Sequence, residues 1–193
     1  MTTVSRETHE RLERFADLLV QWNAKINLVS PRDIAQLWPR HIEDSLQLAE
    51  LIPEGATITD LGSGGGFPGI ILAIATGNPV TLIESDQRKC AFLREAGRIC
   101  EAKVTVIAKR IEAASPPPAD IITARALAPL NRLLDWARPL LKEDGFCLFL
   151  KGQKAQAELT EASADWHMSH TIVPSRTDPG GAIIKVSDFK RVV

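Results

Sequence analysis

Apolar residues recur at two different spacings along the chain, and the spacing changes near residue 56. Before that point they fall three and four positions apart, as on one face of a helix. This pattern predicts an amphipathic helix over 5–26, with Ser5 at its start, then a break at Ser30 and Pro31, and a second helix over 42–51. After that point short β-branched runs alternate with helix-like segments, which predicts a parallel sheet with helices on both faces.

The expected elements of the alternating part follow from this pattern. Strands are expected at 57–61, 79–84, 103–107, 120–124 and 145–150, and helices at 67–76, 86–100, 129–141 and 153–164. Two further apolar runs, 170–174 and 182–186, flank a turn signal at 178–181 and predict a closing antiparallel hairpin. We therefore expect an α/β fold: a Rossmann-like, mostly parallel seven-stranded sheet with a C-terminal antiparallel hairpin and N-terminal helices.

Length and composition limit the organisation of the chain. Its 193 residues suffice for one compact domain, with a helical extension over 1–53 and the main α/β part over 54–193. Apolar residues make up 45% of the chain, a value typical of globular proteins. The net charge of −1 counts mildly against a nucleic-acid substrate, although a neutral protein can carry a local basic face.

Cysteine usage and apolar runs bear on location. Cys90, Cys100 and Cys147 form no C-x-x-C pair, so we expect reduced core thiols and no metal site. The longest apolar run, 70–75, is too short to cross a bilayer, and no secretory signal pattern precedes it. These observations predict a cytoplasmic protein without a membrane partner.

The most informative stretch lies where the first expected strand ends. Residues 57–70 read TITDLGSGGGFPGI, so a β-branched run ends at Asp60 and a glycine loop leads into an apolar helix. Strand, glycine turn and helix together bring bare backbone against a nucleotide-like ligand. Glu84, at the end of the second expected strand, is placed to accept hydrogen bonds from ribose hydroxyls.

Two cofactor patterns overlap in this loop. Asp60, Gly62, Gly64 and Gly66 fit the acid-x-G-x-G-x-G pattern of S-adenosylmethionine (SAM) enzymes, whereas Gly64, Gly66 and Gly69 fit the dinucleotide fingerprint. We favour SAM, because a helix and a hairpin after the parallel strands are too little for the substrate domain of a dehydrogenase. A nucleotide-binding redox or regulatory protein and a small-molecule methyltransferase are the alternatives.

Several segments together resemble a known family. The glycine loop and the segments 27–30 (NLVS), 40–46 (RHIEDSL), 123–126 (TARA) and 151–152 (KG) are similar to signatures of the ribosomal RNA small subunit methyltransferase G family, RsmG or GidB. The resemblance implies a class I SAM-dependent methyltransferase that methylates N7 of a guanosine in the 530 loop of 16S rRNA and releases S-adenosylhomocysteine. It implies 16S rRNA as the partner, in a 30S subunit or an assembly intermediate, and a monomeric enzyme.

Position by position, the resemblance also assigns site residues. The SAM contacts of the family fall on Gly62, Phe67, Ile111, Glu112 and Arg125, and the loop pattern adds Gly64, Gly66 and Glu84. RNA contacts are expected from Arg40, His41, Arg125 and Lys151. No catalytic residue is assigned, because N7 carries a lone pair and no proton, so its methylation needs no general base.

Some of these residues have second interpretations. Arg40 and His41 are expected at the start of the second helix, where cations are disfavoured, which favours an RNA role. A packing role is the alternative for His41, and a solvated strand end is the alternative for Lys151. For Arg125 the choices are the SAM carboxylate, a phosphate, guanine O6 or a surface ion pair. Trp22, Trp136 and Trp166 are expected in the core.

Overall fold

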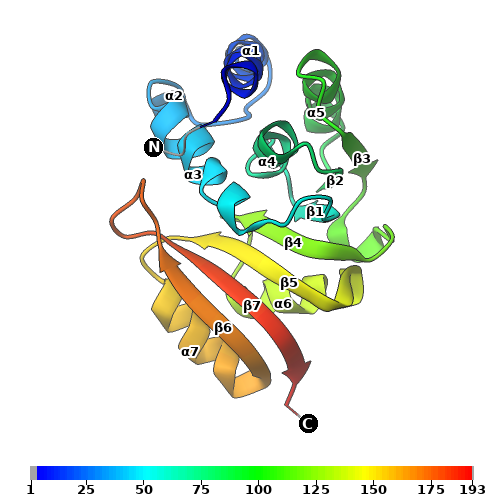
Figure 1. The fold of residues 1–193 in the computed structure, drawn as a ribbon, viewed down its shortest axis with the longest axis vertical. Coiled ribbons are helices and arrows are strands. Elements are labelled where there is room, and N and C mark those ends of the chain that lie inside the picture. The colour runs from blue at the N-terminus through cyan, green and yellow to red at the C-terminus, as the bar shows by residue number, and fades with distance from the viewer. Residues whose placement is uncertain (1–3, 193) are drawn as a thin grey trace.

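The computed structural model describes residues 4–192, and its N-terminal part is helical (Figure 1). Helix α1 (Arg6–Asn23) begins after Ser5, whose Oγ accepts a hydrogen bond from the Thr8 N–H. Three apolar side chains of its inner face are fully buried: Leu12, Phe15 and Leu19. The first helix and its cap are therefore confirmed, although the helix ends at Asn23 and does not reach residue 26.

The second helical segment begins earlier than expected. Helix α2 (Pro31–Ile34) leads through a turn into a π-helical stretch, η1 (Trp38–Ile42), which continues directly into α3 (Glu43–Leu46). Arg40 and His41 therefore lie inside a helical run, and their expected place at a helix N-terminus is wrong. The reason is local, because a serine cap followed by proline starts a helix and does not break one.

The α/β part contains every strand and helix that its pattern predicts, with shifted ends. The strands are β1 (Ile58–Leu61), β2 (Val80–Glu84), β3 (Val104–Ala108), β4 (Ala119–Arg125), β5 (Leu141–Lys151), β6 (Trp166–Pro174) and β7 (Ala182–Arg191). The helices are α4 (Gly69–Thr76), α5 (Gln87–Ile99), α6 (Leu130–Ala137) and α7 (Ala155–Asp165), with short turns η2 (Ala49–Leu51), η3 (Ile111–Ala113) and η4 (Arg138–Leu140).

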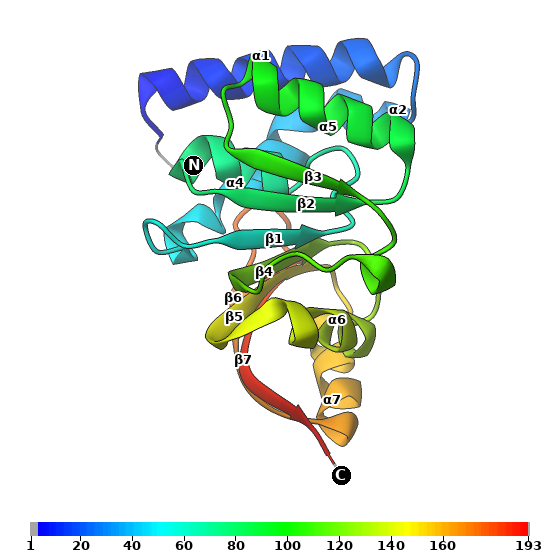
Figure 2. The same ribbon diagram turned by 90° about the vertical axis from the view of Figure 1, so that its right-hand side faces the viewer.

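The seven strands form one mixed sheet in the order β3-β2-β1-β4-β5-β7-β6. The pairs from β3 to β5 are all parallel, so their carboxyl ends lie along one edge, as the arrowheads in Figure 2 show for β1, β2 and β3. From β1 the chain adds β2 and β3 on one side of the sheet and then β4 and β5 on the other side, so the order of strands reverses between β1 and β4. Such a switch point is where open α/β sheets bind ligands.

The closing hairpin is present, and its second strand lies inside the sheet. Strand β7 pairs antiparallel with both β5 and β6, so β6 is the edge strand. The sequence explains this order, because Ala182, Ile183, Ile184 and Val186 of β7 are buried. Most of β6 is exposed, so the more buried strand takes the central place.

Helices cover both faces of the sheet, as the alternation predicts. Helices α1, α3, α4 and α5 share one apolar core with one face, and α6 and α7 share a second core with the other face (Figures 1 and 2). Cys90, Cys100 and Cys147 are free and buried, so the core-thiol interpretation is confirmed. Trp166 is buried as expected, whereas Trp22 and Trp136 are only half-buried and pack against the edges of the two cores.

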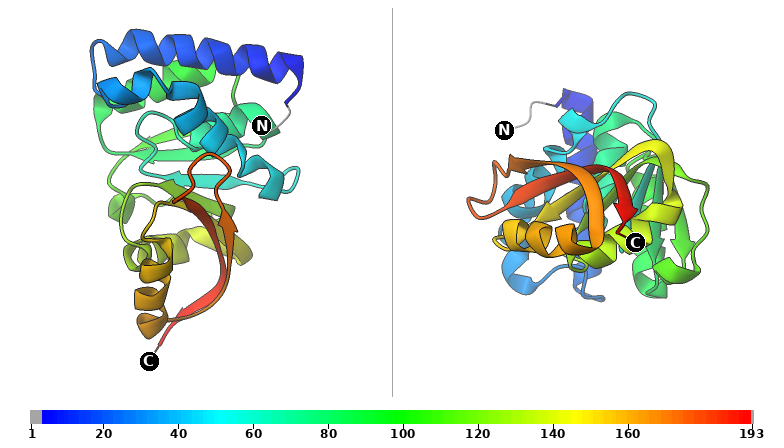
Figure 3. Two further views of the ribbon diagram at one scale, coloured as in Figure 1. Left: turned by 90° about the vertical axis from the view of Figure 1, so that its left-hand side faces the viewer. Right: turned by 90° about the horizontal axis from the view of Figure 1, so that it is seen from below.

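The loop between β6 and β7 reaches back to the N-terminal helices. This hairpin loop, residues 175–181, lies beside α3 in Figures 1 and 3. The Gln47 side chain joins the two, because its Oε1 accepts from the Arg176 N–H at 2.8 Å and its amide donates to Ser175 Oγ at 3.1 Å. Segments from both ends of the chain therefore meet at the carboxyl edge of the sheet.

Candidate active site

The glycine loop bends sharply where β1 ends. Gly62, Gly64 and Gly66 have φ values of 64°, 52° and 90°, a region that side chains rarely adopt. The bend aims the Gly64 N–H at the end of β2, where it donates to Glu84 Oε2 at 2.9 Å. Glycine is therefore needed here for conformation, and the exposed backbone of the loop follows from it.

A fully buried carboxyl group fixes the base of this loop. Asp60 lies in β1, and its Oδ1 accepts a hydrogen bond from Thr123 Oγ1 of β4 at 2.8 Å. Burial raises the pKa of Asp60 to about 6, although hydrogen bonds from Ser63 and Thr123 counteract part of that effect. The side chain thus joins the two strands on either side of the switch point.

A cavity of about 250 Å³, here called the loop cavity, lies against the bend. Its lining comes from the ends of several elements: Gly62, Gly64, Ile83, Glu84, Ser85, Lys89, Lys109, Arg110, Ile111, Glu112, Leu127 and Trp136. The predicted cofactor residues Gly62, Gly64, Glu84, Ile111 and Glu112 are brought together here. The structure therefore groups five residues that are up to fifty positions apart in the sequence.

The carboxylates at the two ends of the loop cavity, Glu84 and Glu112, are held in place by hydrogen bonds. Glu84 Oε1 accepts from the backbone N–H groups of Ser85 and Asp86 at 2.7 and 2.8 Å. A carboxylate has about four acceptor positions, so with Gly64 also bound, one position is left for a ribose hydroxyl. At the other end Trp136 Nε1 donates to Glu112 Oε1 at 3.1 Å, which sets an indole beside the carboxylate.

Gly66, Phe67 and Arg125 are predicted cofactor residues that do not line the loop cavity. The Phe67 ring is buried, with its centroid 5.5 Å from that of Phe15 and 5.0 Å from that of His41. A side chain on Gly66 would meet Ile70 at 2.8 Å, so this glycine serves packing. Phe67 thus attaches the loop to the N-terminal helices.

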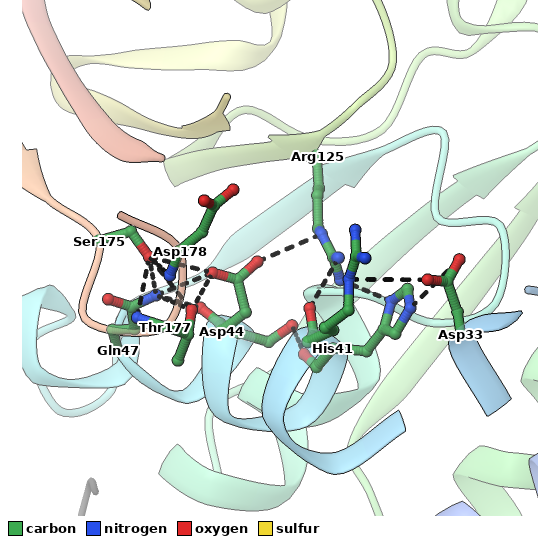
Figure 4. A network of polar contacts seen from close by, with 10 residues as sticks. Asp33, His41, Asp44, Gln47, Arg125, Ser175, Thr177 and Asp178 are labelled. Carbon is green, nitrogen blue, oxygen red and sulfur yellow. Dashed lines mark hydrogen bonds and ion pairs between the residues drawn. The ribbon is translucent and has the colours of Figure 1, made fainter. Parts of the chain in front are cut away.

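Arg125 is the centre of a polar network that joins β4 to the N-terminal helices (Figure 4). Its Nη1 contacts His41 Nδ1 at 2.9 Å, its Nη2 donates to the Arg40 carbonyl at 2.9 Å, and its Nε lies 3.4 Å from Asp44 Oδ2. The guanidinium also lies 5.8 Å from the Phe67 ring centroid. Only 18% of the side chain is exposed, so the surface ion-pair interpretation is wrong.

The tautomer of His41 follows from this contact. A guanidinium cannot accept a hydrogen bond, so Nδ1 must be the unprotonated acceptor and Nε2 carries the proton. Burial, and then the positive charge of Arg125, lower the pKa of His41 to about 4. With 11% of its side chain exposed, His41 matches its packing alternative, whereas Arg40 beside it is 62% exposed.

We expect the His41 ring to remain neutral well below pH 6.5, near which a histidine side chain usually becomes protonated. Because its folded pKa is about 4 and its unfolded pKa is about 6.5, the free energy of unfolding should fall as pH decreases from 6.5 to 4. The loss should be roughly 2–3 kcal/mol. An NMR titration of the ring protons measures the pKa, and His41→Gln, which removes this part of the pH dependence, is the control. A midpoint near 6.5 would contradict the buried neutral ring.

A second cavity, of about 480 Å³, lies between the end of β4 and the hairpin loop. This hairpin cavity is lined by Asp44, Arg125, Ala126, Leu127, Ala128, Pro129, Leu150, Lys151, Gly152, Lys154, Glu158, Ser175, Asp178, Gly181 and Ala182. Leu127 lines both cavities, and its Cδ1 lies 2.6 Å from the position of a Cβ added to Gly62. The two cavities are therefore neighbours, with the Leu127 side chain between them.

Lys151 is neither solvated nor free. Its Nζ lies 2.7 Å from Glu158 Oε2 and donates to the Ala128 carbonyl, and only 6% of its side chain is exposed. The same Glu158 oxygen accepts from the Leu130 N–H at 2.7 Å. The solvated strand-end interpretation is wrong, and the ammonium holds the segment between β4 and α6 in place. A phosphate would have to displace Glu158 to reach it.

Most lining residues of the two cavities were not found from the sequence, and four that matter for the site are Asp44, Leu127, Trp136 and Asp178. Two of them had a local signal, because Leu127 follows Arg125 closely and Asp44 lies in the RHIEDSL segment. Trp136 and Asp178 had none, since only the packing of α6 and the hairpin loop brings them to the cavities. Within residues 4–192, no group of three His, Cys, Asp or Glu side chains is arranged to hold a metal ion. Nor does that part of the chain contain a helix suited to crossing a membrane.

Comparison with known proteins gives consistent matches. The family model GidB, described as rRNA small subunit methyltransferase G, matches residues 8–179. The ribosomal RNA small subunit methyltransferase G of Gluconobacter oxydans is 97% identical over 193 residues and covers 100% of both chains. The protein of that name from Paramagnetospirillum magneticum is 56% identical over 189 residues, covering 97% of this chain and 92% of the relative.

Solved structures share the fold at low sequence identity. M. jannaschii TYW2 in complex with AdoMet has a TM-score of 0.62 at 18% identity, covering 88% of this chain and 80% of that one. A TehB-like SAM-dependent methyltransferase from Corynebacterium glutamicum has a TM-score of 0.58 at 18% identity, covering 96% and 98%. The fold is thus that of class I SAM-dependent methyltransferases, as the sequence predicts.

Proposed function

Because this chain belongs to the rRNA small subunit methyltransferase G family, we propose that it transfers a methyl group from SAM to N7 of a guanosine in the 530 loop of 16S rRNA. The observation that carries the proposal is the pair of neighbouring cavities that share Leu127. One has the groups that suit an adenosine, and the other has room for a base. A redox or regulatory nucleotide-binding protein has no need of the second cavity.

The loop cavity fits the adenosine part of SAM. Gly62 and Gly64 leave bare backbone there, and Glu84 has an acceptor position for a ribose hydroxyl. Glu112, Ile111 and Trp136 provide a carboxylate and apolar surface that suit an adenine ring and its amino group. Bound there, SAM supplies an electrophilic methyl group, and S-adenosylhomocysteine is the product.

The residues of the chain have little chemistry to perform beyond positioning. Guanine N7 has a free lone pair, so no side chain needs to remove a proton. Alignment of two bound reactants alone lowers a barrier by about 7–11 kcal/mol. Leu127 and the buried Lys151–Glu158 pair fix the wall of the hairpin cavity, and Arg125 sits at its rim with a rigid orientation. We assign these residues to positioning and assign no general base.

We propose RNA contacts around the hairpin cavity. Arg40 is 62% exposed and lines, with Arg125, a further cavity of about 300 Å³ beside it. Arginine suits phosphate and base recognition. His41 and Lys151 then act by holding Arg125 and the β4–α6 segment, not by touching RNA. The helical extension 1–53, the monomeric state, the cytoplasmic location and the choice between 30S subunit and assembly intermediate stay predictions.

The reaction is tested with methyl-labelled SAM and small ribosomal subunits that lack this modification. We expect label at one guanosine of 16S rRNA, and strand cleavage at that position after borohydride and aniline treatment, which is selective for N7-methylguanosine. Transfer should weaken steeply as salt rises, because phosphate contacts dominate RNA affinity. Equal labelling of free nucleosides, a flat salt response, or NADH binding without SAM binding would each contradict the proposal.

A further inference from the structure

The hairpin loop lines the hairpin cavity together with Leu127, and hydrogen bonds to α3 and within the loop hold it in place (Figure 4). Asp44 Oδ1 accepts from Thr177 Oγ1 at 2.7 Å, and Ser175 Oγ accepts from the Asp178 N–H at 3.2 Å. The Gly181 N–H closes the turn by donating to the Asp178 carbonyl at 2.9 Å. The backbone of Asp178 is therefore fixed, although its side chain faces solvent and cavity.

Three carboxylates line the hairpin cavity, and two of them already have cationic partners. Asp44 pairs with Arg125 at 3.4 Å, and Glu158 pairs with Lys151 at 2.7 Å. Asp178 makes no ion pair with any residue in the described range 4–192. Its Oδ1 accepts from the Gly180 N–H at 3.0 Å, and no residue of that range donates to Oδ2. In Figure 4 this carboxylate points away from the network of Asp44 and Gln47.

Guanine has a chemistry that matches this arrangement. Its N7 and its Watson–Crick edge lie on opposite sides of the purine, so a base with N7 toward Leu127 and the loop cavity directs its N1–H and 2-amino group away from the loop cavity. Asp178 lines the hairpin cavity and not the loop cavity, so its carboxylate is available to that edge. A carboxylate accepts from both donors at once. Adenine has an acceptor at N1 and no 2-amino group, so the same carboxylate would oppose it.

We propose that Asp178 is the residue that selects guanine, by accepting hydrogen bonds from N1–H and the 2-amino group of the target base. The inference rests on the proposed function and adds to it a residue that reads the base. Positive charge develops on the purine as the N7 lone pair forms its bond to the methyl carbon and the carbon–sulfur bond breaks. A carboxylate on the opposite edge stabilises that charge, so Asp178 should affect kcat as well as KM.

The test compares guanosine with inosine, which lacks only the 2-amino group, at the target position of 16S rRNA in reconstituted small subunits. For the wild-type chain we expect kcat/KM to fall about tenfold or more on inosine. Asp178→Ala should be about 10- to 100-fold slower than wild type on guanosine, and should show no further loss on inosine. Its SAM affinity should be unchanged, since Asp178 does not line the loop cavity.

Two further variants separate base reading from loop structure and from net charge. Asp178→Asn keeps an acceptor for the Gly180 N–H, so it should preserve the turn and still lose most of the guanosine rate. Glu161→Ala removes an exposed acid of α7 that does not line the cavity, and it should leave both rates unchanged. The inference fails if the change from guanosine to inosine slows Asp178→Ala by the same factor as it slows the wild type. It also fails if Asp178→Ala keeps the wild-type rate on guanosine. If the wild type does not methylate guanosine at all, the proposed function fails instead.

Discussion

Replacing Arg125 with alanine should lower kcat/KM for methyl transfer by about 100-fold or more. A guanidinium has five N–H groups. One each is directed at Asp44, His41 and the Arg40 carbonyl, so two of the five remain for a ligand at the rim of the hairpin cavity. Loss of a charge-assisted contact to a SAM carboxylate or an RNA phosphate costs roughly 2–5 kcal/mol. Initial-rate kinetics with labelled SAM and unmodified small subunits measure the change.

The controls for Arg125 separate lost chemistry from lost structure. In Arg125→Ala, Asp44 keeps its hydrogen bond from Thr177, so we expect thermal unfolding to shift by only a few degrees. Arg125→Lys keeps the charge but cannot reach three partners in one plane, and should recover little activity. SAM affinity measured without RNA then shows which anion Arg125 binds: a large loss indicates the SAM carboxylate, and no loss indicates RNA. Near-normal transfer by Arg125→Ala would refute its place in the site.

Replacing Glu84 with alanine should weaken SAM binding by about 10- to 100-fold and also destabilise the fold. The carboxylate accepts three backbone N–H groups, from Gly64, Ser85 and Asp86, and holds the glycine bend against β2. Each hydrogen bond to a charged group contributes about 1.5–3 kcal/mol, part of which water replaces in the variant. Isothermal titration calorimetry with SAM and thermal unfolding measure the two effects.

The matched variant for Glu84 is glutamine. Its amide has the same shape and one acceptor oxygen, so it should keep part of the affinity and lose the charge-assisted part. Stability should be largely restored, because the Ser85 and Asp86 N–H groups still find an acceptor. SAM affinity in Glu84→Ala equal to that of the wild type would show that the ribose lies elsewhere.

Much of the fold could be predicted because its signals are local. Ser5 caps α1 through a hydrogen bond to Thr8, three residues away, and the strands from β1 to β5 each appear as a short apolar run. Where the prediction failed, a local signal had two interpretations. Ser30 and Pro31 look like a break and are a helix start, which moved Arg40 and His41 into the interior of a helical run.

The site was predicted less completely than the fold. Gly62, Gly64 and Glu84 lie at strand ends, and the rule that parallel strands end at one edge places them together. The Phe67 ring points toward Phe15 and His41 and does not line the cavity, because it packs between the loop and the N-terminal helices. Nothing in the local sequence distinguishes a ring that lines a cavity from one that fills a core.

The α/β fold, the family and the place of the glycine loop can be inferred from the amino-acid sequence, because each depends on residues near one another or on periodicities along the chain. The partners of the charged residues are known only from the three-dimensional arrangement. Arg125 binds His41 and Asp44, Lys151 binds Glu158, and Asp178 keeps a free carboxylate oxygen. A charge interacts most strongly with the groups that lie within a few ångströms of it in space, wherever they are in the sequence. These partners come from helical, strand and loop segments that only folding brings together.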